Sequence, residues 1–201
     1  MTNLNNVNSL VVDQEVEGVE AFTGPEQANA YVLRNRSGEK LFEAREEQEG
    51  AGGFIKRNFL ESARPFTIKV VNRDQQCVLE VDRPFTFFLD RMEVKDRDGT
   101  KIGTVEQHFS VFKKKFSVND RQGRRKFMLM GPLFSPWTIN VKRENEKAGM
   151  ITKEWSGAGK ELFTDEDQFA VKFQEDMDAS EKKLLIGALF LIDFKYFERS
   201  E

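Results

Sequence analysis

Residues 184–197 read LLIGALFLIDFKYF and form the most apolar run of the 201-residue chain. Asp178 stands shortly before this run with Glu181 three residues later, a spacing typical of an N-terminal capping box. We therefore expect a helix over about residues 179–198. Its apolar side chains fall on every side of the 3.6-residue period instead of along one stripe. A helix of this kind must be surrounded by apolar groups.

Two surroundings are possible for this helix, the lipid of a bilayer or the interior of the protein. At about 1.5 Å per residue the run spans roughly 21 Å, less than the ~30 Å hydrocarbon core of a bilayer. Asp193 shortens the apolar part further, because a carboxylate deep in hydrocarbon costs at least about 2.5 kcal/mol. We favour burial in the protein and keep a membrane span as the alternative. The expected core residues of the helix are Leu185, Ile186, Leu189, Phe190 and Ile192.

The composition indicates a large apolar core beneath a surface of mixed charge. Nineteen residues are Phe, 32% are charged, and the net charge is only −3. Because both signs are interspersed, no overall bias toward nucleic acid follows. Cys77 is the single cysteine, so we expect no disulfide framework and a reducing compartment such as the cytoplasm.

Most of the remaining sequence has the pattern of β-strands. Residues 66–71 alternate apolar and polar positions, and Asp98-Gly99 is a strong hairpin signal between expected strands at residues 85–95 and 101–108. Residues 109–119 and 124–130 are expected to form the next hairpin. About eleven or twelve short strands follow one another in this way. We expect a mainly β fold, a closed antiparallel barrel of about twelve strands around the buried C-terminal helix. This domain is assigned to residues 29–201, after a flexible leader over residues 1–28.

Several segments carry a resemblance to a known family. Residues 153–157 (KEWSG), 161–169 (ELFTDEDQF) and 185–194 (LIGALFLIDF) closely resemble the C-terminal third of the phospholipid scramblases. The sequence RPFT, at residues 64–67 and again at 83–86, also falls where that family has similar elements. The resemblance covers most of the chain. It implies the Tubby-like fold, a twelve-stranded barrel around a C-terminal helix.

The resemblance also implies a calcium-binding segment, similar to an EF-hand loop, over residues 165–176. Calcium requires hard oxygen ligands, which carboxylates and backbone carbonyls supply. The candidate ligands in order are Asp165, Asp167, the carbonyls of Phe169 and Val171, and Asp176. Ala170 stands where an EF-hand turn uses glycine, and the alternation around it is typical of a strand. An acidic turn beside a strand is the alternative to a low-affinity Ca²⁺ site.

Seven basic residues on one predicted hairpin form a candidate surface for anionic lipid headgroups. They are Lys113, Lys114, Lys115, Arg121, Arg124, Arg125 and Lys126. We expect antiparallel pairing to bring the two clusters together, and each basic residue near a membrane surface contributes about 1 kcal/mol. The resemblance to Tubby-like proteins implies phosphoinositide binding here. A solvated strand face is the alternative, and no nucleic-acid recognition motif favours nucleic acid as the partner.

No pattern in the sequence indicates covalent catalysis. His108 is the single histidine, and no serine or cysteine pattern supplies a nucleophile for it, so we expect that the protein is not an enzyme. Two functions stay open. The resemblance implies calcium-dependent, bidirectional movement of phospholipids between leaflets, and the alternative is a soluble Tubby-like module that binds an anionic lipid headgroup or a protein partner. We expect a cytoplasmic protein that associates with a membrane surface.

Overall fold

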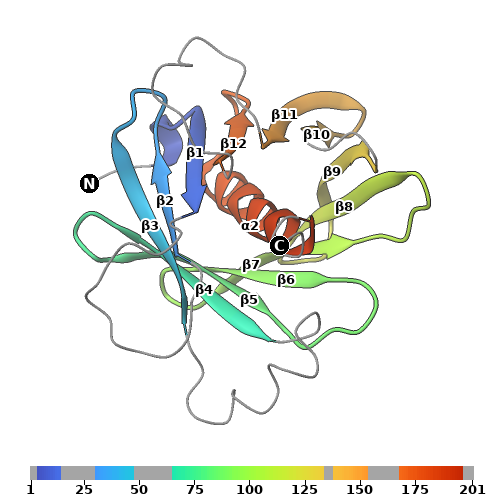
Figure 1. The fold of residues 1–201 in the computed structure, drawn as a ribbon, viewed down its shortest axis with the longest axis horizontal. Coiled ribbons are helices and arrows are strands. Elements are labelled where there is room, and N and C mark those ends of the chain that lie inside the picture. The colour runs from blue at the N-terminus through green and yellow to red at the C-terminus, as the bar shows by residue number, and fades with distance from the viewer. Residues whose placement is uncertain (1–3, 15–29, 48–64, 134–137, 154–167, 197–201) are drawn as a thin grey trace.

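The computed structural model describes residues 4–14, 30–47, 65–133, 138–153 and 168–196 (Figure 1). In these residues, twelve antiparallel strands form a closed barrel around one long helix. The strands are β1 (Ser9–Gln14), β2 (Ala30–Arg34), β3 (Lys40–Glu47), β4 (Phe66–Asn72), β5 (Cys77–Arg83), β6 (Arg91–Asp96), β7 (Lys101–Gln107), β8 (Lys113–Asp120), β9 (Arg125–Pro132), β10 (Thr138–Arg143), β11 (Glu146–Thr152) and β12 (Gln168–Phe173). The short 3₁₀-helix η1 is Leu4–Asn6, and the long helix α2 is Ala179–Tyr196.

Each strand pairs with the next strand in the sequence, and the sheet closes where β1 pairs with β12. At this closure Ser9 lies opposite Lys172, and Asp13 lies opposite Gln168. Closing a sheet removes the edges at which another chain would pair. The helix lies in the centre of the barrel (Figure 1). The predicted fold, a closed antiparallel barrel of about twelve strands around a C-terminal helix, is confirmed.

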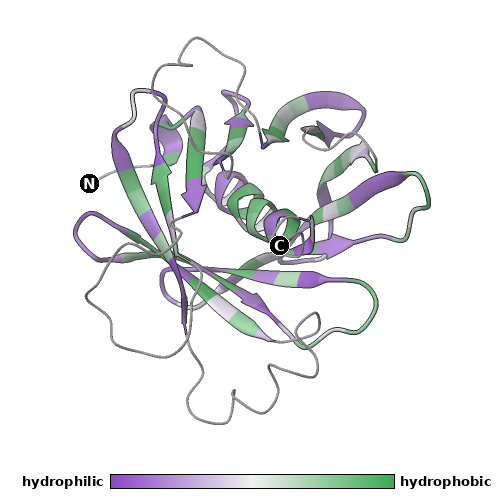
Figure 2. Ribbon diagram, viewed as in Figure 1, coloured by the Kyte–Doolittle hydropathy of each residue, from purple (hydrophilic) through white to green (hydrophobic). Residues whose placement is uncertain are grey.

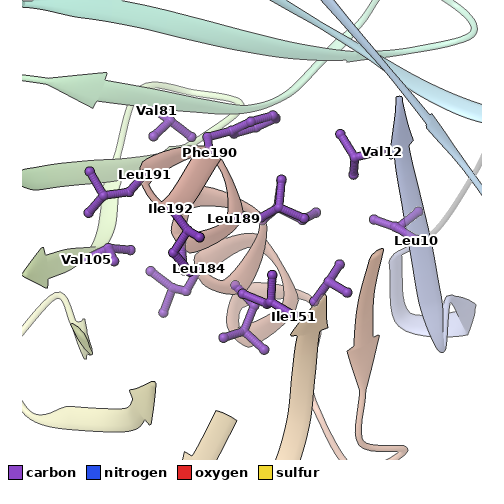
Figure 3. Close-up of a cluster of buried hydrophobic side chains, with 14 of the residues drawn as sticks. Leu10, Val12, Val81, Val105, Ile151, Leu184, Leu189, Phe190, Leu191 and Ile192 are labelled. Carbon is purple, nitrogen blue, oxygen red and sulfur yellow. The ribbon is translucent and has the colours of Figure 1, made fainter. Parts of the chain in front are cut away.

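The interior of the barrel is filled by α2 and by the inward-facing residues of the strands. In β4 the buried residues are Phe66, Ile68, Val70 and Asn72, and they alternate with half-buried residues on the outer face. Figure 3 shows side chains leaving α2 in several directions, toward β1 on one side and toward β5 and β7 on the other. All the residues predicted to form the helix core are buried, namely Leu185, Ile186, Leu189, Phe190 and Ile192.

Gly187 allows α2 to approach the barrel wall closely. A Cβ atom at this position would lie 2.6 Å from Cγ2 of Val94 on β6. Optimal contacts between carbon atoms are about 3.5–4.0 Å, so any larger residue would push the helix away from the sheet. The helix is thus buried in protein, as expected. Within the described ranges, no helix has both the length and the apolarity needed to cross a membrane.

Two buried charges on α2 contact segments that are distant in the sequence. The ammonium group of Lys182 donates hydrogen bonds to the carbonyl oxygens of Leu4 and Asn5, at 3.1 and 2.7 Å. The hydroxyl of Tyr31 donates to Oδ2 of Asp193 at 2.8 Å. Polar partners of this kind offset the cost of placing a charge in the interior. They also attach η1 and β2 to the helix.

The prediction of a flexible leader over residues 1–28 is wrong for residues 4–14. These residues form η1 and β1, and β1 lies between β12 and β2 in the barrel. Leu10 and Val12 are fully buried, and burying such side chains contributes about 1.5–3 kcal/mol each. The prediction failed because one short apolar run among polar residues does not reveal a partner 160 residues away. Residues 15–28 lie outside the described residues.

Two predicted strands begin later than the sequence pattern indicated. The strand expected from residue 85 begins at Arg91, and the strand expected from residue 109 begins at Lys113. β5 and β6 pair only as far as Asp82 and Glu93, so the chain leaves the sheet between them. The apolar residues that suggested strands therefore belong to connecting loops.

Candidate lipid-binding surface

The barrel has two ends that present different side chains to solvent. The turn end carries short hairpin turns, among them residues 73–76, 97–100 and 121–124. The loop end carries the connections at residues 84–90 and 108–112. Helix α2 begins at the turn end and finishes at the loop end, as its ion pairs show. Nζ of Lys183 lies 2.6 Å from Asp96, whereas Nζ of Lys195 lies 2.6 Å from Asp90.

The two predicted basic clusters lie at opposite ends of the barrel, so the prediction that pairing brings them together is wrong. Lys113 pairs with Pro132, and Asn119 pairs with Arg125. At about 3.3 Å per residue, the two clusters are roughly 20 Å apart along the hairpin. The physical reason is the antiparallel register. Only residues equidistant from the turn meet, and Lys113 is much farther from the turn than Arg125.

Three of the seven basic residues are engaged within the protein. Lys114 is buried, with Nζ 4.2 Å from the centre of the Tyr196 ring, and burial lowers the pKa of its ammonium group. Arg124 contacts Asp120 at 2.8 Å, and Lys126 contacts Glu181 at 3.1 Å. In the described part of the chain, the other four have no carboxylate within 4 Å, and these four are Lys113, Lys115, Arg121 and Arg125.

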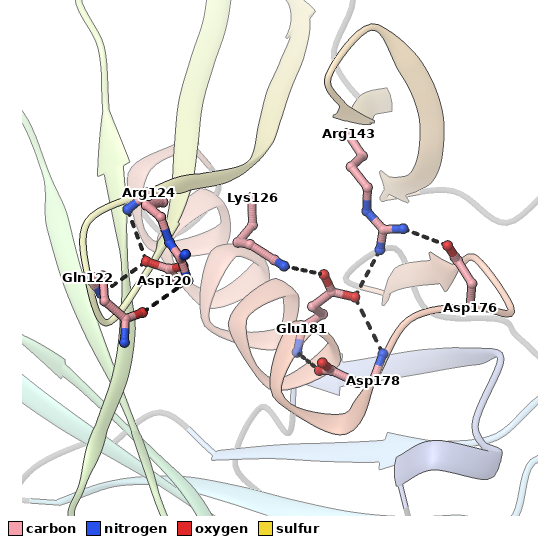
Figure 4. A network of polar contacts seen from close by, with 8 residues as sticks. All are labelled: Asp120, Gln122, Arg124, Lys126, Arg143, Asp176, Asp178 and Glu181. Atoms are coloured by element: carbon pink, nitrogen blue, oxygen red, sulfur yellow. Dashed lines mark hydrogen bonds and ion pairs between the residues drawn. The ribbon is translucent and has the colours of Figure 1, made fainter.

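At the turn end, an ion-pair network surrounds the start of α2 (Figure 4). Arg143 contacts Asp176 at 2.6 Å and Glu181 at 2.8 Å. Oδ1 of Asp178 accepts a hydrogen bond from N–H of Glu181 at 2.8 Å, and Oε2 of Glu181 accepts one from N–H of Asp178 at 3.4 Å. This reciprocal pair is the capping box predicted from the sequence.

The described part of residues 165–176 does not form an EF-hand loop. Residues 168–173 are the extended strand β12, which pairs with β1 and with β11, so the carbonyls of Phe169 and Val171 lie within the sheet. An EF-hand loop instead curls its ligands to within 2.3–2.6 Å of one ion. Asp176 follows the strand and contacts Arg143. Among the described residues no cluster of three or more acidic, His or Cys side chains could hold a metal, and Asp165 and Asp167 lie outside them.

The loop end exposes large apolar side chains, which the sequence analysis had assigned to strands. In the described residues, all the exposed large hydrophobic side chains lie in the two connections of this end: Phe85, Phe87, Phe88, Leu89, Phe109, Val111 and Phe112. Both loops project at the right of Figure 2, where their bends are green. The signal in the sequence was the three consecutive apolar residues 87–89, which do not alternate as a half-buried strand does.

A buried ion cluster holds the first of these loops. The guanidinium group of Arg83 contacts Asp90 across the loop, and Lys195 contacts the same carboxylate. Burial alone would raise the pKa of Asp90, but hydrogen bonds from Lys195 and Arg83 hold this pKa below its ordinary value. Cζ of Arg83 also lies 4.4 Å from the centre of the Phe194 ring. The loop is thereby attached to the last turns of α2.

Hydrogen bonds join the first loop to Gln107, the last residue of β7, from which the second loop starts. N–H of Gln107 donates to the carbonyl of Asp90 at 2.8 Å, and N–H of Asp90 donates to Oε1 of Gln107 at 3.1 Å. The second loop is closed by N–H of His108, which donates to the carbonyl of Lys115 at 2.9 Å. These hydrogen bonds and the ion cluster therefore attach the loops that carry the exposed aromatic residues to the barrel and to α2.

His108 has a serine partner that the sequence analysis did not foresee. Its Nε2 lies 2.8 Å from Oγ of Ser117, the residue that β-pairing places opposite Glu106. The side chain of Ser117 is buried at 4% exposure. A nucleophile must reach its substrate, so this pair is better explained as a structural contact.

Comparison with known proteins places the chain in a family. The family model described as Scramblase matches residues 1–199. The chain belongs to the scramblase family. It is 30% identical over 211 residues to phospholipid scramblase 1 of Rattus norvegicus, an alignment that covers 98% of this chain and 62% of the relative. It is 30% identical over 209 residues to phospholipid scramblase 2 of Bos taurus, covering 97% of this chain and 70% of the relative. No solved structure matches.

The resemblance predicted from the sequence is therefore confirmed. This scramblase family member spans only about three fifths of the length of the rat protein and of its mouse counterpart, phospholipid scramblase 1 of Mus musculus. The region that they share includes the whole barrel and α2.

Proposed function

We propose that this protein binds anionic phospholipid bilayers and moves phospholipids between their leaflets. The observation that carries the proposal is membership of the scramblase family over nearly the whole chain. Four exposed or half-buried cations, Lys113, Lys115, Arg121 and Arg125, have no carboxylate within 4 Å among the described residues. They support the binding step, because basic residues near an anionic membrane contribute about 1 kcal/mol each. The single cysteine supports a cytoplasmic location at the membrane surface.

A second candidate is a module that holds a lipid headgroup or a protein partner and moves no lipid. The position of α2 favours it. A helix that is buried on every side from Leu184 to Phe194 does not contact acyl chains there while the barrel stays closed. Lipid movement by this protein then requires either a path over the outside of the barrel or an opening of the barrel wall.

Two measurements on the same vesicles separate the candidates. Vesicles of phosphatidylcholine and phosphatidylserine carry a fluorescent NBD-lipid, and added dithionite destroys only the label in the outer leaflet. A protein that moves lipid exposes the inner label too, so that the fluorescence falls beyond the outer-leaflet fraction. Co-sedimentation measures binding separately. Binding with no additional loss of fluorescence supports the module, and absence of binding contradicts lipid movement and headgroup binding and leaves only the module that binds a protein partner.

Calcium dependence stays a prediction that rests on Asp165 and Asp167. Because only two carboxylates are available and no EF-hand turn supports them, we expect weak Ca²⁺ binding, with a dissociation constant of about 10⁻⁴–10⁻³ M. Titration calorimetry should detect binding by the parent and none by the variant Asp165→Asn/Asp167→Asn. Equal binding by both proteins would place the ion elsewhere, and no binding by either would favour a calcium-independent function.

A further inference from the structure

The loop end combines exposed aromatic side chains with a rigid support. Phe88, Phe109 and Phe112 are 91, 81 and 75% exposed. Phe85 and Phe87 stack edge to face, with ring centres 4.7 Å apart. Exposing so much apolar surface to water is unfavourable, and contiguous patches of this kind mark interaction sites. The Arg83–Asp90–Lys195 cluster and the bonds between Gln107 and Asp90 hold the loops in this arrangement.

Basic residues outnumber acidic ones in the two described loops and the residues that flank them. Residues 83–91 and 107–115 contain five basic residues and one acidic residue, Asp90. The carboxylate of Asp90 is buried and neutralised by Arg83 and Lys195. Lys113 follows Phe112 directly and is exposed, with no carboxylate within 4 Å among the described residues. A negatively charged surface is therefore the complementary partner.

We propose that the loop end is the surface by which this protein enters a bilayer, with Phe87, Phe88, Phe109 and Phe112 inserted among the headgroups of anionic lipids. Membrane-surface proteins combine Phe or Leu with Lys or Arg and bury the apolar groups about 5–10 Å deep. Protein–protein interfaces, in contrast, are depleted in Lys. The aromatic residues also project from two separate loops, and a fluid bilayer accepts such a shape without a matching pocket.

This orientation has a consequence for α2. The last turn of the helix carries Lys195 and Tyr196, and both lie at the loop end, against Asp90 and against Lys114. Insertion of the loops points the C-terminal end of α2 at the bilayer and the turn end away from it. The inference rests on the membrane binding proposed above but does not depend on lipid movement.

The first test removes the aromatic side chains. The variant Phe87→Ser/Phe88→Ser/Phe109→Ser/Phe112→Ser should lose about tenfold or more in binding to phosphatidylcholine–phosphatidylserine vesicles, where tenfold corresponds to about 1.4 kcal/mol. Its thermal melt should match the parent because these side chains are exposed. The matched variant with Leu at the same four positions keeps the apolar surface and should retain most of the binding.

Each outcome bears on a different claim. Equal vesicle binding by the parent and the Ser variant overturns the insertion proposal and leaves the proposed function standing. A parent that binds no vesicles overturns both. If light scattering shows that the parent is a dimer and the Ser variant a monomer, with equal vesicle binding, the loop end is a contact between two copies instead.

The second test locates the contact directly. In a Cys77→Ser background, Phe88→Cys at the loop end and Gln122→Cys at the turn end are labelled with NBD. Vesicles should increase the NBD fluorescence of the Phe88→Cys protein and shift it to shorter wavelength, and lipids with a doxyl quencher should quench it. The label at position 122 should not respond. A response at position 122 alone, or equal responses at both positions, contradicts the proposed orientation.

Discussion

The turn end and the loop end of the barrel differ in where they place charged and apolar side chains. At the turn end, Glu181 is buried, but its partners Arg143 and Lys126 are partly exposed (Figure 4). At the loop end, Arg83 and Asp90 are buried while Phe88 points into solvent. Both ends bury charged groups at a cost, but among the described residues only the loop end also exposes large apolar side chains to water, which folding alone does not favour. The bilayer contact proposed above would offset this cost.

Both ends depend on the same helix. Near its start α2 carries Glu181 and Lys182, which hold the turn-end network and η1. Near its finish it carries Asp193 and Lys195, which contact Tyr31 and the loop-end cluster. From Leu184 to Ile192 the helix is apolar on every side. The two ends are therefore fixed relative to each other through one packed core.

The largest expected effect comes from breaking that core. Leu189 is fully buried, so Leu189→Asp places an unpaired carboxylate where the barrel wall closes on α2. The cost is several kcal/mol, against a typical total stability of about 5–15 kcal/mol. Circular dichroism should show loss of the whole fold, and the arrangements of the turn end and the loop end should be lost together because both depend on α2. The control Leu189→Met conserves volume and should cost less than about 1.5 kcal/mol. A folded Leu189→Asp protein would refute the enclosed helix.

A smaller effect separates the two ion clusters. Arg83→Ala removes one partner of a buried pair and should cost about 3–5 kcal/mol of unfolding free energy. Arg143→Ala removes a side chain that is 31% exposed and leaves the buried Glu181 paired with Lys126, so it should cost less, about 1 kcal/mol. Urea unfolding of both variants measures the difference. Equal losses of unfolding free energy would show that the buried Arg83 cluster contributes no more to stability than the partly exposed Arg143 cluster, which would contradict this prediction.

The sequence predicted the parts of this molecule that depend on local pattern. Residues 178–181 predicted the capping box, and the all-round apolar residues 184–192 predicted an enclosed helix and hence the barrel. It failed where distant segments decide the outcome. Only tertiary pairing shows that Leu10 belongs to the wall, and only the register shows that Lys113 and Arg125 lie at opposite ends. The aromatic loops were missed because their apolar residues were read as strands, although no neighbouring strand pairs with them.

The loop-end cluster should also make stability depend on pH. The pKa of Asp90 in the folded state lies below its ordinary value of 3.8, since hydrogen bonds from Lys195 and Arg83 outweigh burial. The ionised carboxylate therefore stabilises the fold at pH values above about 4, and this contribution is lost as the pH falls through the folded-state pKa. The difference in unfolding free energy between the parent and Asp90→Asn should be largest near neutral pH and shrink below pH 4. A difference that stays constant down to pH 2 would contradict this role of Asp90.

The smallest effect on folding, and the sharpest comparison of the two ends, comes from their free cations. Lys113→Ala/Lys115→Ala and Arg121→Ala/Arg125→Ala each remove two charges that have no carboxylate partner among the described residues, so both should change the unfolding free energy by no more than about 0.5 kcal/mol. Non-specific attraction to an anionic bilayer predicts equal losses of vesicle binding, because the change in net charge is the same. An inserted loop end predicts unequal losses. The turn-end pair is then held roughly 20 Å farther from the lipid, beyond the ~8 Å Debye length at physiological ionic strength.

Co-sedimentation at 0.15 M salt should therefore show a clear loss of vesicle binding for the lysine variant, about 1 kcal/mol per residue, and little loss for the arginine variant. At about 0.01 M salt, where the Debye length is ~30 Å, the two variants should converge. Equal losses at both salt concentrations would mean that the barrel meets the bilayer in no fixed orientation.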